Sequence, residues 1–141
     1  MNILISACLL GQYCRYDGKT KVYPQVQDLL GRDDIHLIPV CPEQAGGLAT
    51  PRPAAERQGS RVVTANGSEV TAQYQRGAEA ALYWARLFHC TKAILKEKSP
   101  SCGHGQIYDG TFSRTLTVGD GVTAALLRAE GLEIIGESDL P

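Results

Sequence analysis

Residues 2–8, NILISAC, form an apolar run that predicts a buried strand and ends on a cysteine. The pattern occurs twice more, because Cys41 follows the apolar run at 35–40 and Cys102 comes shortly after the run at 93–96. Parallel strands end at a common edge of their sheet, which is where open α/β folds build their sites. The sequence therefore predicts that the three thiols converge at this edge.

Helical patterns separate these runs. Residues 24–30 predict a short helix that Gly31 ends, and residues 71–89 predict the longest helix, with apolar side chains at three- and four-residue steps. A last helix is expected over 122–130, before a fourth strand at 132–135. Strands that alternate with helices favour parallel pairing through right-handed crossovers. We therefore predict an α/β fold with a parallel sheet flanked by helices.

Two segments depart from this alternation. The dipeptide Asn66-Gly67 suits a tight turn, so the runs at 61–63 and 69–70 predict a small peripheral hairpin. Residues 97–120 are rich in Gly, Ser and Thr and show no clear helix or strand. A loop of that length in a compact domain is usually functional, and this one carries Cys102.

Size and charge narrow the classes of protein and partner. The 141 residues fit one globular domain, residues 1–141. The 14 basic and 15 acidic residues nearly cancel, which argues against the positive field of a nonspecific nucleic-acid binder and favours a small-molecule partner. No apolar stretch approaches the roughly twenty residues of a membrane span, and no signal peptide is recognisable. We therefore expect a cytoplasmic protein without a membrane partner, and no pattern indicates its oligomeric state.

The cysteines suggest metal chemistry. Five cysteines in a reducing compartment are unlikely to form a disulfide framework, and an odd number cannot pair internally. Cys8, Cys41 and Cys102 lie 33 and 61 residues apart, far beyond the spacing of zinc knuckles, so only the folded chain could unite them. Three thiols suit a metal ion or an iron–sulfur cluster. Two alternatives remain open: a structural zinc site completed by His104, and a metal-free hydrolase with His104 as base to Cys102.

Short motifs rich in glycine, proline and cysteine occur along the chain. They are SACLLG at 6–11, RYDG at 15–18, CPE at 41–43, GGL at 46–48, TPR at 50–52, LKEKSPSCG at 95–103 and IYDGTF at 107–112. Together and in this order they resemble the thiouracil desulfidase family. The resemblance covers essentially the whole chain and matches the stand-alone form, without the additional C-terminal domain of longer members.

The resemblance implies both a cofactor and a reaction. It implies a Rossmann-like domain with a 4Fe-4S cluster held by Cys8, Cys41 and Cys102, which leaves one iron open. It also implies removal of sulfur from thiolated pyrimidines, such as thiouracil, 4-thiouridine or its monophosphate, with release of hydrogen sulfide. Glu43 and Ser101 match positions implicated in catalysis.

The expected chemistry is hydrolysis without net redox change. An open iron would act as a Lewis acid toward the thiocarbonyl sulfur and polarise the carbon–sulfur bond. Glu43, two residues after Cys41, is the expected base for the attacking water, and Ser101 is expected to donate a hydrogen bond or relay a proton.

Candidates for substrate binding lie in the same loops. Arg15, Arg52 and Lys98 would neutralise a nucleotide phosphate, as would Lys96, and His104 would contact the substrate. A thiolated position in tRNA fits the near-neutral charge less well than a free base or nucleotide.

Two cysteines have no expected ligand role. Cys14 is expected to pack in the interior or lie behind the ligands, and Cys90 to pack in the core.

Overall fold

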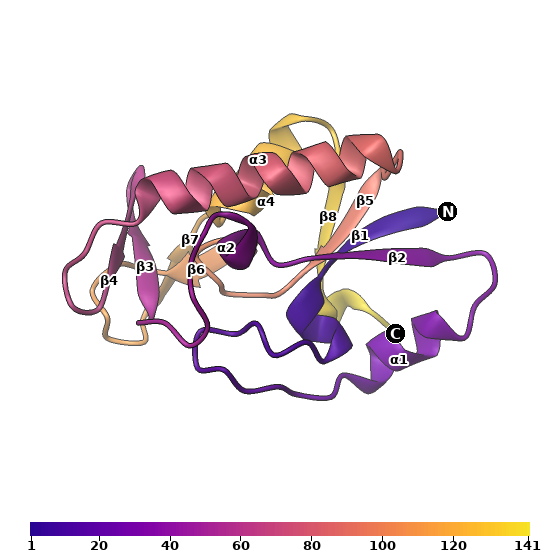
Figure 1. The fold of residues 1–141 in the computed structure, drawn as a ribbon, viewed down its shortest axis with the longest axis horizontal. Helices are drawn as coiled ribbons and strands as arrows, with labels where there is room; N and C mark the ends of the chain where they lie inside the picture. The colour runs from indigo at the N-terminus through magenta and orange to yellow at the C-terminus, as the bar shows by residue number, and fades with distance from the viewer.

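A parallel sheet of four strands forms the centre of the computed structural model, which describes residues 1–141 (Figure 1). The strand order is β2-β1-β5-β8, with bounds β1 Asn2–Ser6, β2 His36–Val40, β5 Lys92–Leu95 and β8 Glu133–Gly136. All three pairings are parallel, so the strands end at one edge. The predicted α/β class is confirmed.

Helices cover both faces of this sheet (Figure 1). The two helices α3 (Thr71–Leu87) and α4 (Val122–Ala129) pack together on one face, over a core that includes Leu4, Leu95 and Leu127. The opposite face carries α1 (Pro24–Leu30), whose Val26 packs with Ile3 and Ile94. None of the helices has the length and apolar character needed to cross a membrane.

The longest helix is shorter than predicted. The apolar pattern extended it to residue 89, but α3 ends at Leu87, because Phe88 leaves helical geometry and His89 adopts a φ of 55°. Phe88 is partly exposed and stacks on Trp84 with ring centroids 6.0 Å apart.

A one-turn helix packs directly on α3 and was not predicted. Helix α2 (Pro42–Ala45) follows β2 and contacts α3 through two glycines. A Cβ atom at Gly77 would lie 1.8 Å from the carbonyl oxygen of Pro42, and one at Gly46 would lie 1.9 Å from that of Gln73. These glycines let the two backbones touch, which fixes the segment that carries Cys41 and Glu43.

Two hairpins lie beside the sheet instead of one. The strands β3 (Ala55–Gln58) and β4 (Arg61–Thr64) pair antiparallel, and Asn66-Gly67 forms a second turn that adds only a single bridge, between Val63 and Glu69. The predicted pairing of 61–63 with 69–70 is therefore wrong in its extent.

The segment 97–120, predicted to be irregular, contains β6 (Gln106–Tyr108) and β7 (Leu116–Val118). The 3-10 turns η1 (Ala7–Leu10) and η2 (Glu137–Asp139) follow β1 and β8.

Candidate metal centre

Three loops at the carboxyl edge of the sheet carry the three predicted thiols. Cys8 lies in η1 directly after β1, Cys41 lies between β2 and α2, and Cys102 lies in the loop after β5. Cys102 is buried, whereas Cys8 and Cys41 are partly exposed. Burial raises the pKa of Cys102, and the charges of Cys8 and Cys41 add to this rise, so the three thiols share one electrostatic environment.

Local hydrogen bonds fix two of these loops. The hydroxyl of Ser6 accepts the N–H of Lys96 at 2.9 Å, which ties the end of β1 to the end of β5. The hydroxyl of Ser99 accepts the N–H groups of Ser101 and Cys102, each at 3.1 Å. The loop after β5 therefore holds Cys102 through a side-chain-capped turn.

A fourth thiol, Cys14, lies among the others. Its hydrogen bonds with Cys8 and Cys41 lower the pKa of both: that of Cys41 falls to about 7 although burial opposes the change. The pKa of Cys14 itself is raised, because its hydrogen bonding with Cys41 and Cys8 and its burial both favour the protonated thiol. The thiol of Cys41 also lies 3.8 Å from the carbonyl oxygen of Cys14, to which it can donate. Cys14 is 2% exposed, in agreement with the predicted place behind the ligands.

The donor set fits a cluster better than a single ion. No group of three or more His, Cys, Asp or Glu side chains converges on one ion position. Thiolates of an iron–sulfur cluster bind different irons, so they do not need to converge on one point. The fourth ligand of the zinc alternative, His104, places its Nε2 3.4 Å from Asp139 Oδ2. The hydrolase alternative lacks a base in contact with its nucleophile, because the thiol of Cys102 pairs with the hydroxyl of Ser101 and not with His104.

Glu43 lies in the first turn of α2 and is paired with Arg52. The Nε and an Nη of Arg52 donate to Oε2 of Glu43 at 3.0 and 2.6 Å, and the two side chains are 7% and 15% exposed. The negative charge of Glu43 raises the pKa of Cys102 and opposes the fall at Cys8 and Cys41. The carboxylate is therefore next to the thiols, as the sequence predicted.

Ser101 lies in the loop after β5 and is completely buried against the first turn of α4. Its hydroxyl shares a hydrogen bond of 2.9 Å with that of Thr123, and the thiol of Cys102 lies 3.9 Å away. The N–H groups of Thr123 and Ala124 donate to its carbonyl oxygen. A Cβ at Gly121 would lie 2.4 Å from that oxygen, so only glycine lets α4 approach so closely.

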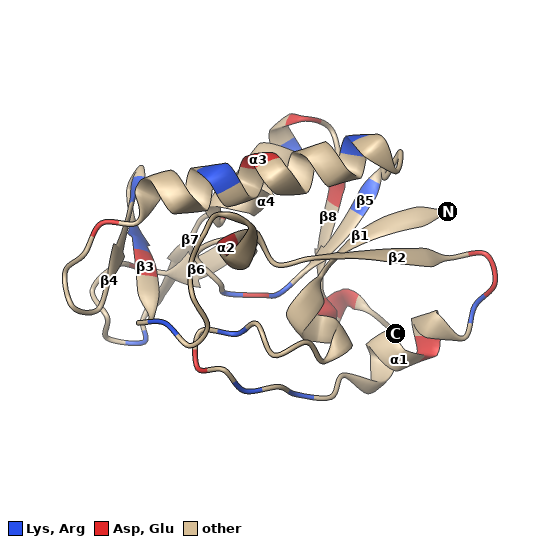
Figure 2. Ribbon diagram, viewed as in Figure 1, with Lys and Arg blue, Asp and Glu red and all other residues tan.

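The other predicted binding residues are more dispersed. Arg15 lies 3.5 Å from Asp17, and both side chains are partly exposed. Lys98 is exposed and adopts a φ of 67°, which turns the chain just before Cys102. Figure 2 shows basic segments between η1 and α1 and after β5, each interrupted by an acidic residue, so these two loops carry more basic than acidic residues.

Lys96 lies at the site although it was only a secondary candidate. Its Nζ is 2.7 Å from Oε2 of Glu137, and this hydrogen bond raises the pKa of Lys96 although burial opposes the change. Its positive charge also lowers the pKa of Cys8. The partner Glu137 is separated by 41 residues, so no local pattern could have revealed the pair.

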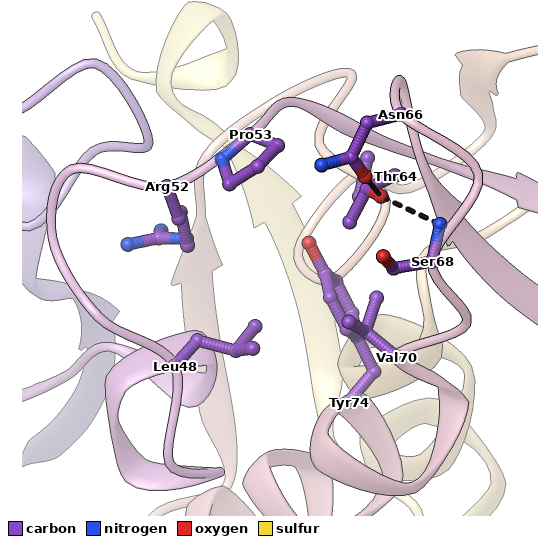
Figure 3. Close-up of a pocket in the computed structure, with 9 residues that line it drawn as sticks. Leu48, Arg52, Pro53, Thr64, Asn66, Ser68, Val70 and Tyr74 are labelled. Atoms are coloured by element: carbon purple, nitrogen blue, oxygen red, sulfur yellow. Dashed lines mark hydrogen bonds between the residues drawn. The ribbon is translucent and has the colours of Figure 1, made fainter.

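A cavity of about 190 Å³ opens beside Arg52 and Tyr74 (Figure 3). The Tyr74 ring projects from α3 into it, with the hydroxyl between Arg52 on one side and Thr64 on the other (Figure 3). The remaining wall combines apolar and small polar side chains, including Leu48, Val70, Asn66 and Ser68. Sequence reasoning missed this cavity, because the β3–β4 hairpin and the turn after it were expected to be peripheral.

Taken together, the sheet and its edge define an α/β protein with a thiol-lined centre next to a paired carboxylate. A model of the 2-thiouracil desulfurase family matches residues 3–139. The uncharacterized protein YbbK of Bacillus subtilis (strain 168) is 42% identical over 148 residues, which cover 98% of this chain and 97% of YbbK.

A solved structure described as the [4Fe-4S]-dependent thiouracil desulfidase TudS superposes with a TM-score of 0.93. It is 50% identical in sequence, and the match covers 99% of this chain and 93% of that chain. The chain belongs to the 2-thiouracil desulfurase family, and the resemblance found in its motifs is confirmed.

Proposed function

We propose that this protein is an enzyme that removes sulfur from thiolated pyrimidines with a 4Fe-4S cluster held by Cys8, Cys41 and Cys102. The observation that carries the proposal is the meeting of three thiols from three separate loops next to the Glu43 carboxylate. When bound, the cluster would supply an iron without a protein ligand, which acts as a Lewis acid toward soft sulfur. Water replaces sulfur at the ring carbon and hydrogen sulfide leaves, so no electrons are transferred.

Two side chains would handle protons in this reaction. Glu43 accepts a proton from the attacking water, which general base catalysis requires within hydrogen-bonding reach. Ser101, buried beside the Cys102 thiol, donates a hydrogen bond or relays a proton to the departing sulfur. Thr123 orients the Ser101 hydroxyl through their shared hydrogen bond.

The cavity lined by Arg52, the partner of Glu43, is our candidate for the pyrimidine ring. At about 30 Å³ per water molecule, its volume of about 190 Å³ is the space of about six waters, which suits a single ring. Leu48 and Val70 offer apolar contact, and Asn66 and Ser68 offer polar groups for the ring edge. A monophosphate would then reach Arg15, Lys98 or His104, the cationic or ionisable candidates of the neighbouring loops.

The remaining predictions complete the proposal. We propose that residues 1–141 act as one domain, in the cytoplasm, on a free base or nucleotide in preference to a thiolated position in tRNA.

The direct test is anaerobic reconstitution followed by a sulfide assay. The protein is loaded with iron and sulfide, and its iron content is measured. Thiouracil, 4-thiouridine and 4-thiouridine monophosphate are then added separately. We expect about four irons per chain and sulfide release that depends on them. A colourless protein with one zinc, or full activity in an iron-free preparation, would contradict the proposal.

A further inference from the structure

All five N–H donors of Arg52 are engaged inside the protein. Two donate to Oε2 of Glu43. Two more donate to the carbonyl oxygen of Ala49 at 3.2 Å and to the hydroxyl of Thr50 at 3.1 Å. The fifth donates to the carbonyl oxygen of Cys14 at 2.9 Å. With its side chain 7% exposed, Arg52 has no donor left for a substrate phosphate, the role that its motif suggested.

The pairing with Glu43 is one-sided. Both donors of Arg52 bind Oε2, which leaves Oε1 as the oxygen that can accept a proton from water. The Tyr74 hydroxyl lies in the cavity between Arg52 and Thr64 (Figure 3), close enough to Glu43 for the charge of that carboxylate to act on it. Burial, and then the negative charge of Glu43, raise the pKa of Tyr74 well above its ordinary value, so Tyr74 keeps its proton and can donate it in a hydrogen bond.

We propose that Arg52 is a positioning residue that holds Oε2 of Glu43 and aims its Oε1 at the attacking water, and that the Tyr74 hydroxyl helps to hold the same carboxylate. The inference rests on the proposed function and gives the arginine of the TPR motif a task other than phosphate binding. Both residues line the same cavity (Figure 3), and the hydrogen bonds of Arg52 connect the wall of this cavity to the Glu43 carboxylate. A misplacement of about 1 Å in such a group can cost roughly a hundredfold in rate.

A merely structural arginine is the competing explanation. Arg52 joins the loop that carries Cys14, the segment 49–50 and helix α2, so its loss could loosen the thiol edge. That role predicts loss of iron and a lower melting temperature. Positioning of Glu43 instead predicts slower chemistry at equal iron content and unchanged substrate affinity.

The experiment uses the reconstituted full chain and two substrates. Arg52→Lys keeps one positive charge but cannot make the paired contacts, and Tyr74→Phe removes a single hydroxyl and keeps the ring. Each change is made alone and together with Glu43→Gln. Arg61→Lys and Tyr83→Phe are the matched controls, because Arg61 pairs with Glu69 at an exposed site and Tyr83 is exposed on α3. Iron content, melting temperature, kcat and KM are measured with 4-thiouracil and with 4-thiouridine monophosphate.

We expect Arg52→Lys to lower kcat by about tenfold to a hundredfold on both substrates, with KM and iron content unchanged. Tyr74→Phe should lower kcat by a smaller factor. When Glu43 is already replaced by glutamine, neither change should lower kcat further by more than about threefold, because both are expected to act through the Glu43 carboxylate. The controls should match the parent protein.

Several outcomes would overturn the inference. A rise in KM limited to the monophosphate would make Arg52 a phosphate anchor. If the losses in kcat were fully additive with that of Glu43→Gln, Arg52 and Tyr74 would not act through the Glu43 carboxylate. Loss of iron in Arg52→Lys, with no kcat effect in Tyr74→Phe, would leave only the structural role.

Crystal structures of the two variants provide a readout that does not depend on activity. We expect the Glu43 carboxylate to rotate or to occupy more than one conformer in Arg52→Lys. An unchanged single conformer would contradict positioning. If instead the loaded parent protein releases no sulfide from either substrate, the proposed function fails. The conformers of Glu43 would still test whether Arg52 holds its carboxylate.

Discussion

The three thiols at the sheet edge have unequal surroundings, although we assign them the same role. Cys102 is buried, whereas Cys8 and Cys41 are partly exposed and share a hydrogen-bonding neighbour in Cys14. Each of the three thiolates would bind a different iron, so the removal of any one of them breaks a bond that holds the cluster. The buried ligand and the two exposed ligands should therefore be equally indispensable.

Replacement of Cys8, Cys41 or Cys102 by serine should abolish cluster loading and sulfide release. Cys90→Ala, in the core, and Cys14→Ala should keep both. Iron content after anaerobic reconstitution and the visible absorption of the cluster are the measurements. A Cys41→Ser protein that held four irons and reacted at the parent rate would contradict the assignment. Loss of the cluster in Cys14→Ala would instead indicate a ligand role for Cys14.

Replacement of Glu43 by glutamine should separate binding from chemistry. The amide keeps nearly the same shape but cannot accept a proton from water. We expect normal iron content and a fall in single-turnover sulfide release of about a hundred- to ten-thousand-fold. A rate within about threefold of the parent, at equal iron content, would exclude Glu43 as the essential base.

Sequence reasoning found the thiols and Glu43 because each follows an apolar run or a motif along the chain. It could not find the partners of Arg52, which are brought together from residues 14, 43, 49 and 50 by the fold. The place of Cys14 between Cys8 and Cys41 depends on the path of the loop after η1, which no periodic pattern specifies.

At the scale of secondary structure, the contact between α2 and α3 decides where the metal centre lies. Gly77 lets α3 touch the carbonyl oxygen of Pro42, and Pro42 stands between Cys41 and Glu43 in the chain. Any displacement of α2 therefore moves a ligand and the base together.

Gly77→Ala should destabilise the protein although alanine favours a helix by about 1 kcal/mol over glycine. The added methyl group would clash with Pro42, and overpacking of this kind typically costs about 1–3 kcal/mol. We expect a lower melting temperature and less iron per chain. Gly31→Ala is the control, because its Cβ would lie 3.6 Å from the nearest atom. Stabilisation by Gly77→Ala would show that the two backbones are not in contact.

The elements that sequence reasoning predicted well are those with long apolar runs, namely the four strands and three longer helices. Helix α2 has only four residues, too few for a helical period to show. The strands β6 and β7 have three residues each, and β7 lacks buried side chains, so no alternation marked them. Asn66-Gly67 was a correct turn signal but belongs to the second turn, after Gly59 with its φ of 62° has already closed the hairpin.

At the scale of the whole molecule, a bound cluster would connect loops that follow three different strands. Because only the folded chain presents the three thiols together, binding should add to the free energy of unfolding. Removal of iron by a chelator should therefore lower the melting temperature, while the parallel sheet and its helices persist. Calorimetry and circular dichroism of both forms are the measurements. Identical melting temperatures would indicate that the thiols do not hold the cluster in the proposed way.

The positions of the three ligands along the sequence also set an order of events during synthesis. Cys102 follows β5, late in the chain, so the ribosome releases Cys8 and Cys41 long before Cys102. A growing chain shorter than about a hundred residues offers only two of the ligands. Iron and sulfide must therefore be delivered to the nearly complete protein, because shorter nascent chains lack the full set of cluster ligands.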